Sequence, residues 1–261
     1  MKKRARSPLF IWLVSVGAVI FMMNGSPHVR AHEVPQPDAV KVPIFIYHSV
    51  RPYFPGESSL QDEYDITPEL FEKHLIYLRD NGYTTVTLDE LAGFIERKTT
   101  APVAKPVILS FDDGWENQYR FAFPLLKKYG MTATFYIYTN PIGKEPYLSW
   151  NQIRDMAAAG MTIASHTLSH RPLHLLSPAE LAKELRESKR ILEMKLGIPI
   201  SHFATPFGYT GAKIMKAVKE AGYTTCRTAY DGVYHSATDL LKLHGNQTTD
   251  YFADFVEVLR Q

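Results

Sequence analysis

The stretch Pro106-Val107-Ile108-Leu109-Ser110-Phe111-Asp112-Asp113-Gly114 places two adjacent carboxylates at the end of an apolar run. The run has the length and composition of a buried strand. An ionised acid at the rim of a core costs several kcal/mol unless a cation or a shared proton compensates it. The pair therefore predicts a metal site at the end of this strand, and Gly114 permits the chain to turn there.

Strand and helix patterns alternate along the rest of the chain. The predicted strands are Val42–His48, Thr84–Val86, Val107–Phe111, Thr132–Tyr138, Thr162–Ser165, Phe203–Thr205 and Thr224–Arg227. The predicted helices are Thr67–Asn81, Leu88–Arg97, Glu116–Tyr129, Trp150–Ala159, Pro178–Leu196, Ala212–Ala221 and Asp250–Leu259. Glycines follow several of these helices, as expected of helix ends. The alternation indicates a single α/β domain with a parallel sheet or barrel.

The N-terminal segment predicts export. A positive stretch at residues 2–6 precedes an apolar stretch at residues 9–23, and small residues near position 31 fit a cleavage point. The apolar stretch is short for a membrane-spanning helix of roughly 20 residues, although about 17 can suffice. Residues 1–31 are thus predicted to be a signal peptide, or else a membrane anchor through residues 9–23. Residues 32–41 are a predicted linker, and 42–261 the folded domain of a periplasmic, cell-surface or secreted protein.

Charge and cysteine content narrow the function classes. Five of the 29 basic residues precede the first acid, Glu33, which leaves 24 basic against 27 acidic residues in the remainder. This balance gives no indication of a nucleic-acid partner. The single cysteine, Cys226, cannot form an internal disulfide, so the exported domain must depend on core packing. The oligomeric state is not predictable from these features.

His166 and His170 directly follow the predicted strand at 162–165, and zinc binds such nitrogens readily. Two other histidine pairs share the four-residue spacing, so spacing alone discriminates little. Position is more informative, because ligands in α/β barrels come from the C-terminal ends of strands, as Asp113 does. One carboxylate and two imidazoles leave coordination positions open, which is typical of a catalytic metal. A second carboxylate beside such a metal can remove a proton from water.

Three motifs resemble those of the polysaccharide deacetylases, the NodB homology group of carbohydrate esterase family 4. They are Ser-Phe-Asp-Asp-Gly at 110–114, His-Thr-Leu-Ser-His at 166–170 and Phe-Ala-Thr-Pro-Phe-Gly at 203–208. The resemblance implies a distorted, incomplete (β/α)7-type TIM-like barrel with a homology core at about 105–261. It also implies that Asp113, His166 and His170 bind a divalent metal and that Asp112 is the general base. Zn²⁺ is the expected metal, with Co²⁺ or Ni²⁺ as alternatives.

Upstream segments at 45–50, 67–71 and 82–88 resemble the branch that contains the bacterial poly-N-acetylglucosamine deacetylases. This resemblance implies a hydrolase that removes N-acetyl groups from a GlcNAc-containing extracellular or cell-wall polysaccharide. His48 would then be the general acid. In other branches the acid lies near the C-terminus, where His244 in Leu241-Lys242-Leu243-His244 fits the corresponding motif. His48 is favoured, because a histidine at the end of the first strand has little structural reason to be there.

The third motif departs from the family pattern at Ala204, where many members have an arginine that orients the base. Lys242, or an arginine from elsewhere, is the hypothetical substitute. Pro206 and Phe207 remain, and the resemblance implies that a main-chain N–H near Phe207 stabilises the oxyanion. Trp115, beside the acids, either stacks on a sugar or packs over the barrel.

Other functions remain open at this point. The same site fits other acyl sugars, such as peptidoglycan, chitin or xylan. A carbohydrate-binding pseudoenzyme is supported only by Ala204. A barrel amidohydrolase for small cyclic amides fits the site but not the leader, because such enzymes act in the cytoplasm.

Overall fold

The computed structural model describes residues 39–54, 56, 64–96 and 103–261. The predicted leader, residues 1–31, and most of the predicted linker lie outside these residues. In the described part of the chain, no helix is both long and apolar enough to cross a membrane.

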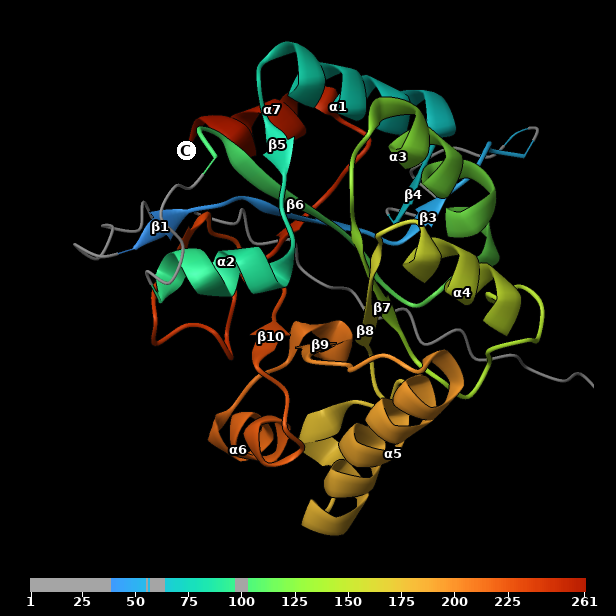
Figure 1. The fold of residues 1–261 in the computed structure, drawn as a ribbon, viewed down its shortest axis with the longest axis vertical. Helices are drawn as coiled ribbons and strands as arrows, with labels where there is room; N and C mark the ends of the chain where they lie inside the picture. The colour runs from blue at the N-terminus through green and yellow to red at the C-terminus, as the bar shows by residue number, and fades with distance from the viewer. Residues whose placement is uncertain (1–38, 55, 57–63, 97–102) are drawn as a thin grey trace, which may run out of the picture. The chain divides into compact units, whose positions relative to one another are not determined.

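A curled parallel sheet forms the centre of the described domain (Figure 1). Its strands, in order across the sheet, are β10 (Thr225–Arg227), β9 (His202–Ala204), β8 (Thr162–Ser165), β7 (Thr134–Ile137), β6 (Pro106–Phe111), β2 (Ile44–Tyr47) and β12 (Asn246–Gln247), and β5 (Thr84–Thr85) also pairs with β6. Neighbouring strands all run parallel, so their C-terminal ends meet at one edge. The predicted α/β class and incomplete barrel are confirmed.

The strands are buried on both faces, which explains why they are read as continuous apolar runs. One set of side chains, including Ile44, Ile108 and Tyr136, fills the interior of the curled sheet. The alternate set, including Phe45, Leu109 and Phe135, packs against the surrounding helices. These helices are α1 (Pro68–Asp80), α3 (Phe123–Tyr129), α4 (Trp150–Ala158), α5 (Pro178–Leu196), α6 (Ala212–Glu220) and α7 (Phe252–Arg260). The buried residues of the remaining helix, α2 (Leu88–Ile95), pack with the interior set instead.

The register of β2 against β6 places the first strand's histidine beside the acid pair. Tyr47 pairs with Phe111, and the Asp112 N–H donates to the Tyr47 carbonyl at 2.9 Å. His48 and Asp112 therefore follow adjacent strand ends. The sequence positions are 64 residues apart, so only the sheet topology brings these side chains together.

Several short elements depart from the sequence prediction. The helix predicted at Glu116–Tyr129 begins as predicted, but a π-helical segment, η1 (Gln118–Ala122), interrupts it before α3. Two-residue strands also form the pairs β1 (Val40–Lys41) with β11 (Tyr234–His235) and β3 (Ser49–Val50) with β4 (Asp65–Ile66). Such strands are too short to show a periodic pattern, so tertiary pairing alone reveals them.

Candidate active site

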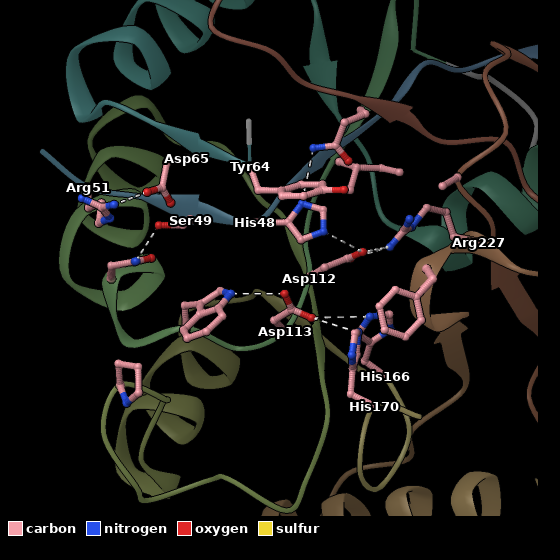
Figure 2. Close-up of a pocket in the computed structure, with 18 of the residues that line it drawn as sticks. His48, Ser49, Arg51, Tyr64, Asp65, Asp112, Asp113, His166, His170 and Arg227 are labelled. Atoms are coloured by element: carbon pink, nitrogen blue, oxygen red, sulfur yellow. Dashed lines mark hydrogen bonds and ion pairs between the residues drawn. The ribbon is translucent and has the colours of Figure 1, made fainter. Parts of the chain in front are cut away.

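A cavity of about 590 Å³ opens at the C-terminal edge of the sheet. Its lining includes Asp112, Asp113, His166 and His170, which come from the ends of β6 and β8 (Figure 2). The segment at 51–64 contributes Arg51, Phe54 and Tyr64, while most of its other residues lie outside the described part of the chain. The structure thus brings the sequence-predicted acids and histidines to a single cavity.

Asp113, His166 and His170 present one ligand atom each within 4.8 Å of one another. Asp113 Oδ1 lies 3.7 Å from His166 Nε2 and 3.3 Å from His170 Nε2. This oxygen is buried and accepts no hydrogen bond from the residues that the structure describes. A carboxylate oxygen and two imidazole nitrogens around one point fit a divalent cation, and the unsatisfied oxygen is where such a cation would bind.

A left-handed turn separates the two aspartates in direction. Asp113 has φ +73° and Gly114 has φ +74°. A Cβ at Gly114 would lie 2.9 Å from the Ile137 side chain, so a larger residue does not fit there. The turn aims Asp113 at the histidines while Asp112 points elsewhere, as the sequence predicted from Gly114.

The protonation of this trio follows its burial. Burial lowers the pKa of His166 to about 3 and also lowers the pKa of His170. Both rings are therefore neutral at neutral pH, which is the form that binds metals. The His166 Nδ1 lies 2.9 Å from the Ala204 carbonyl, which accepts its proton and leaves Nε2 free toward Asp113. Burial raises the pKa of Asp113, so a proton competes with a cation for this carboxylate.

The partner of Asp112 is Arg227, at the end of β10. The Arg227 Nη2 donates to both carboxylate oxygens of Asp112, and both side chains are buried. Burial alone would raise the pKa of Asp112, but the Arg227 guanidinium, together with smaller effects of His166 and His48, lowers the pKa below its ordinary value. Asp112 is therefore an ionised carboxylate at neutral pH, ready to accept a proton.

The sequence predicts a basic partner for Asp112 but does not identify Arg227 as that partner. Lys242, the named substitute for the arginine absent at Ala204, is exposed and has no recorded bond to Asp112. Arg227 instead extends across the interior from β10, with its guanidinium 5.0 Å above the Tyr136 ring. A signal was present, because Arg227 ends a predicted buried strand, as Asp112 follows one.

His48 lies on the other side of the base. Its Nε2 is 3.9 Å from Asp112 Oδ2, and its ring lies 4.8 Å from the Tyr64 ring. The buried Gln118 amide, on the π-helical turn, donates to the main-chain carbonyls of His48 (2.6 Å) and Asp112 (2.5 Å). Gln118 therefore ties together the two strand ends that carry the predicted acid and base.

The competing histidine occupies a different place. His244 lies 5.8 Å from the His235 ring and packs so closely on Gly232 that a Cβ there would meet its ring at 2.0 Å. Among the described residues, His48 lines the cavity and His244 does not. The geometry therefore favours His48, although its role as the acid stays a prediction.

The remaining predicted residues flank the three candidate metal ligands, Asp113, His166 and His170. Phe207 is 58% exposed, has φ +59°, and its ring lies 4.7 Å from that of His170. The preceding residue, Pro206, is buried. Trp115 donates through Nε1 to Asp113 Oδ2 at 3.2 Å and stacks on Tyr147 at 4.6 Å. Trp115 thus orients a predicted metal ligand, a role that the sequence reading did not consider.

The chain is similar to known proteins of one family, the polysaccharide deacetylases. The profile of the family described as polysaccharide deacetylase matches residues 99–226. A Bacillus subtilis (strain 168) protein named "Putative polysaccharide deacetylase YxkH" is 32% identical over 204 residues, which is 78% of this chain and 70% of that protein. The poly-beta-1,6-N-acetyl-D-glucosamine N-deacetylase of Staphylococcus aureus (strain MRSA252) is 27% identical over 198 residues, covering 67% of this chain and 68% of the relative.

Solved structures agree with this assignment. The Streptococcus pyogenes deacetylase PplD, in complex with acetate, superposes with a TM-score of 0.79 at 27% identity, covering 85% of this chain and 99% of that one. IcaB from Ammonifex degensii superposes with a TM-score of 0.74 at 26% identity, covering 84% of this chain and 96% of that one. The chain belongs to the polysaccharide deacetylase family.

Proposed function

We propose that this protein removes N-acetyl groups from a GlcNAc-containing extracellular or cell-wall polysaccharide, with a divalent metal held by Asp113, His166 and His170. The observation that carries the proposal is the convergence of two sets of groups in one cavity. The trio offers three ligands to a cation, and the Asp112–Arg227 pair with His48 offers proton transfer beside it. The similarity to the staphylococcal N-deacetylase supports the choice of polymer.

In the proposed reaction each side chain has a separate task. A divalent metal at this position would polarise the acetyl carbonyl and acidify the attacking water. Asp112, held ionised by Arg227, removes the water's proton as the general base. His48, on the far side of Asp112 from Arg227, protonates the leaving sugar nitrogen. The main-chain N–H groups near Phe207 stabilise the charge that develops on the acetyl oxygen.

The choice of metal follows from the ligands. Two imidazoles and one carboxylate with further positions open are typical of catalytic zinc, and Co²⁺ or Ni²⁺ would suit the same set. Export is part of the proposal as well, because the substrate lies outside the cytoplasm and residues 1–31 have the pattern of a signal peptide. Cell fractionation with a reporter fused after residue 41 tests this point.

The deciding experiment measures acetate released from β-1,6-linked GlcNAc oligomers, chitin oligomers and peptidoglycan. We expect release from the β-1,6-linked substrate, loss of release on chelation, and its return with Zn²⁺. Asp112→Asn should abolish turnover, whereas Asp155→Asn, an exposed change of the same kind on α4, should not. Release that persists after complete removal of metal, or in Asp112→Asn, would refute the mechanism. Release only from peptidoglycan or chitin would refute the choice of polymer.

A further inference from the structure

The loop that carries His170, the second histidine of the predicted metal site, has an unusual backbone. We call residues Thr167–His170 the ligand loop. Thr167 has φ +78° and His170 has φ +56°, and neither residue is glycine. Left-handed backbone at such residues costs on the order of 1–3 kcal/mol each and persists only where the surroundings enforce it. Contacts with the surrounding residues must therefore hold His170 in this conformation.

A buried carboxylate on α5 supplies three of these contacts. Glu184 is only 5% exposed, although glutamate is rarely buried without a partner. Its Oε2 accepts the main-chain N–H groups of Leu168 at 3.0 Å and Ser169 at 2.9 Å. Its Oε1 accepts the Ser169 hydroxyl. Among the described residues, all of the side-chain hydrogen bonds of Glu184 therefore go to the ligand loop.

The opposite side of the ligand loop is fixed by main-chain groups that follow β7. The N–H of Thr139 donates to the Thr167 carbonyl at 3.2 Å, and that of Asn140 donates to the Leu168 carbonyl at 2.9 Å. Within the loop, the His170 N–H donates to the Thr167 hydroxyl at 2.9 Å. Glu184 is thus the side chain that satisfies the two loop N–H groups between Thr167 and His170.

We propose that Glu184 is a positioning residue for the metal site: it holds the ligand loop so that His170 faces Asp113 before the metal binds. Its negative charge also favours a cation nearby, since the three donors that it bonds are all neutral. The inference rests on the proposed metal site and adds to it the element that preorganises one ligand. Outer contacts of this kind typically change metal affinity by about 10–100-fold.

The test compares Zn²⁺ dissociation constants, measured by chelator competition on the purified domain. Glu184→Gln removes the charge and one acceptor, and we expect about 10–100-fold weaker binding. Glu187→Gln is the matched control, because Glu187 lies on the same helix, is partly exposed and pairs with Arg190. This control should bind Zn²⁺ as the wild type does. The thermal midpoint of each metal-free protein is measured in parallel.

The outcomes separate this inference from the proposed function. A wild type that binds no Zn²⁺, Co²⁺ or Ni²⁺ would overturn the proposed metal site and this inference with it. A wild type that binds metal, with Glu184→Gln binding equally well, would overturn this inference alone, even if the variant melts earlier. If Glu184→Gln does not fold, Ser169→Ala removes a single bond to Glu184, and unchanged affinity in that variant would refute the proposal.

Discussion

Replacing Arg227 with methionine is expected to move the ionisation of Asp112 to higher pH and so shift the pH dependence of catalysis. Asp112 is buried, and burial alone raises its pKa, whereas the Arg227 guanidinium lowers it below the ordinary value. Without Arg227 the first effect remains. The general base would then be protonated over part of the pH range in which the wild type is active, so turnover near pH 6 should fall more than turnover near pH 8.

The same substitution leaves a buried charge without its partner, and the loss of stability can be bounded. Removing one member of a buried ion pair costs about 3–5 kcal/mol. For a domain of this size each kcal/mol lowers the thermal midpoint by about 2–4 °C, so we expect a drop of about 6–20 °C. The wild-type benefit is present above the unfolded-state pKa of Asp112 and is lost as pH falls through the lower folded-state pKa. The gap in stability between wild type and variant should therefore narrow in acid.

The assay is kcat/KM for acetate release as a function of pH, with metal saturating, because this ratio reports the pKa values of the free enzyme. Lys242→Met is the matched control, since it removes an exposed positive charge from the residue first considered for this role. The control should retain the wild-type profile. An acidic limb that stays in place in a folded Arg227→Met protein, or one that moves in Lys242→Met instead, would refute the assignment of Arg227.

Three further predictions follow from the site and the core. His48→Gln should lower kcat by about 10²–10⁴-fold while metal content stays constant, and His244→Gln should have little effect; the reverse order would make His244 the acid. Asp113→Asn should abolish stoichiometric Zn²⁺ binding, measured by metal analysis, whereas Asp112→Asn should retain it; equal Zn²⁺ content in both would contradict the ligand assignment. Burial lowers the pKa of His74 to about 3, so the unfolded state binds an extra proton between about pH 3 and 6.5, and stability should fall as pH drops through this window by up to about 1.4 kcal/mol per pH unit. Denaturant unfolding of wild type and His74→Phe checks this, and equal slopes against pH would exclude His74 as a source.

The fold and the three candidate metal ligands could be predicted from the sequence because both depend on local patterns. Parallel strands that are buried on both faces produce the apolar runs, and Asp113, His166 and His170 follow two of those runs directly. Their meeting at the C-terminal edge then follows from the topology. The two-residue strands β1, β3, β4 and β11 were not predictable, because each is defined by its pairing with a strand elsewhere in the sequence.

Arg227 shows the limit of this approach at the site itself. Among the 29 basic residues, Arg227 is marked only by its position at the end of a predicted buried strand, and this does not show that its guanidinium points into the sheet interior. The residue lies on β10, next to the β9 strand that carries Ala204, and Arg227 is in register with Ala204 across the two strands. A charge needed at one point of the interior can thus come from either neighbouring strand. The motif pattern at Ala204 records only one of these two solutions.

The buried charges also explain why a single arginine does not complete the site. Asp112 and Asp113 line the cavity and Glu184 lies beside it, and of these three carboxylates Arg227 pairs with Asp112. Asp65, also in the lining, has its own partner in Arg51. His166 contributes no positive charge at neutral pH, because burial lowers its pKa to about 3, and the pKa of His170 is lowered as well. Burial raises the pKa of Asp113, and the charge of Asp112 beside it acts in the same direction, so a proton or a cation is favoured at this carboxylate. A divalent cation at Asp113 would balance the two carboxylate charges that Arg227 does not neutralise. The need for a cation, first inferred from two adjacent aspartates, therefore arises from Asp112, Asp113, Glu184 and Arg227 together.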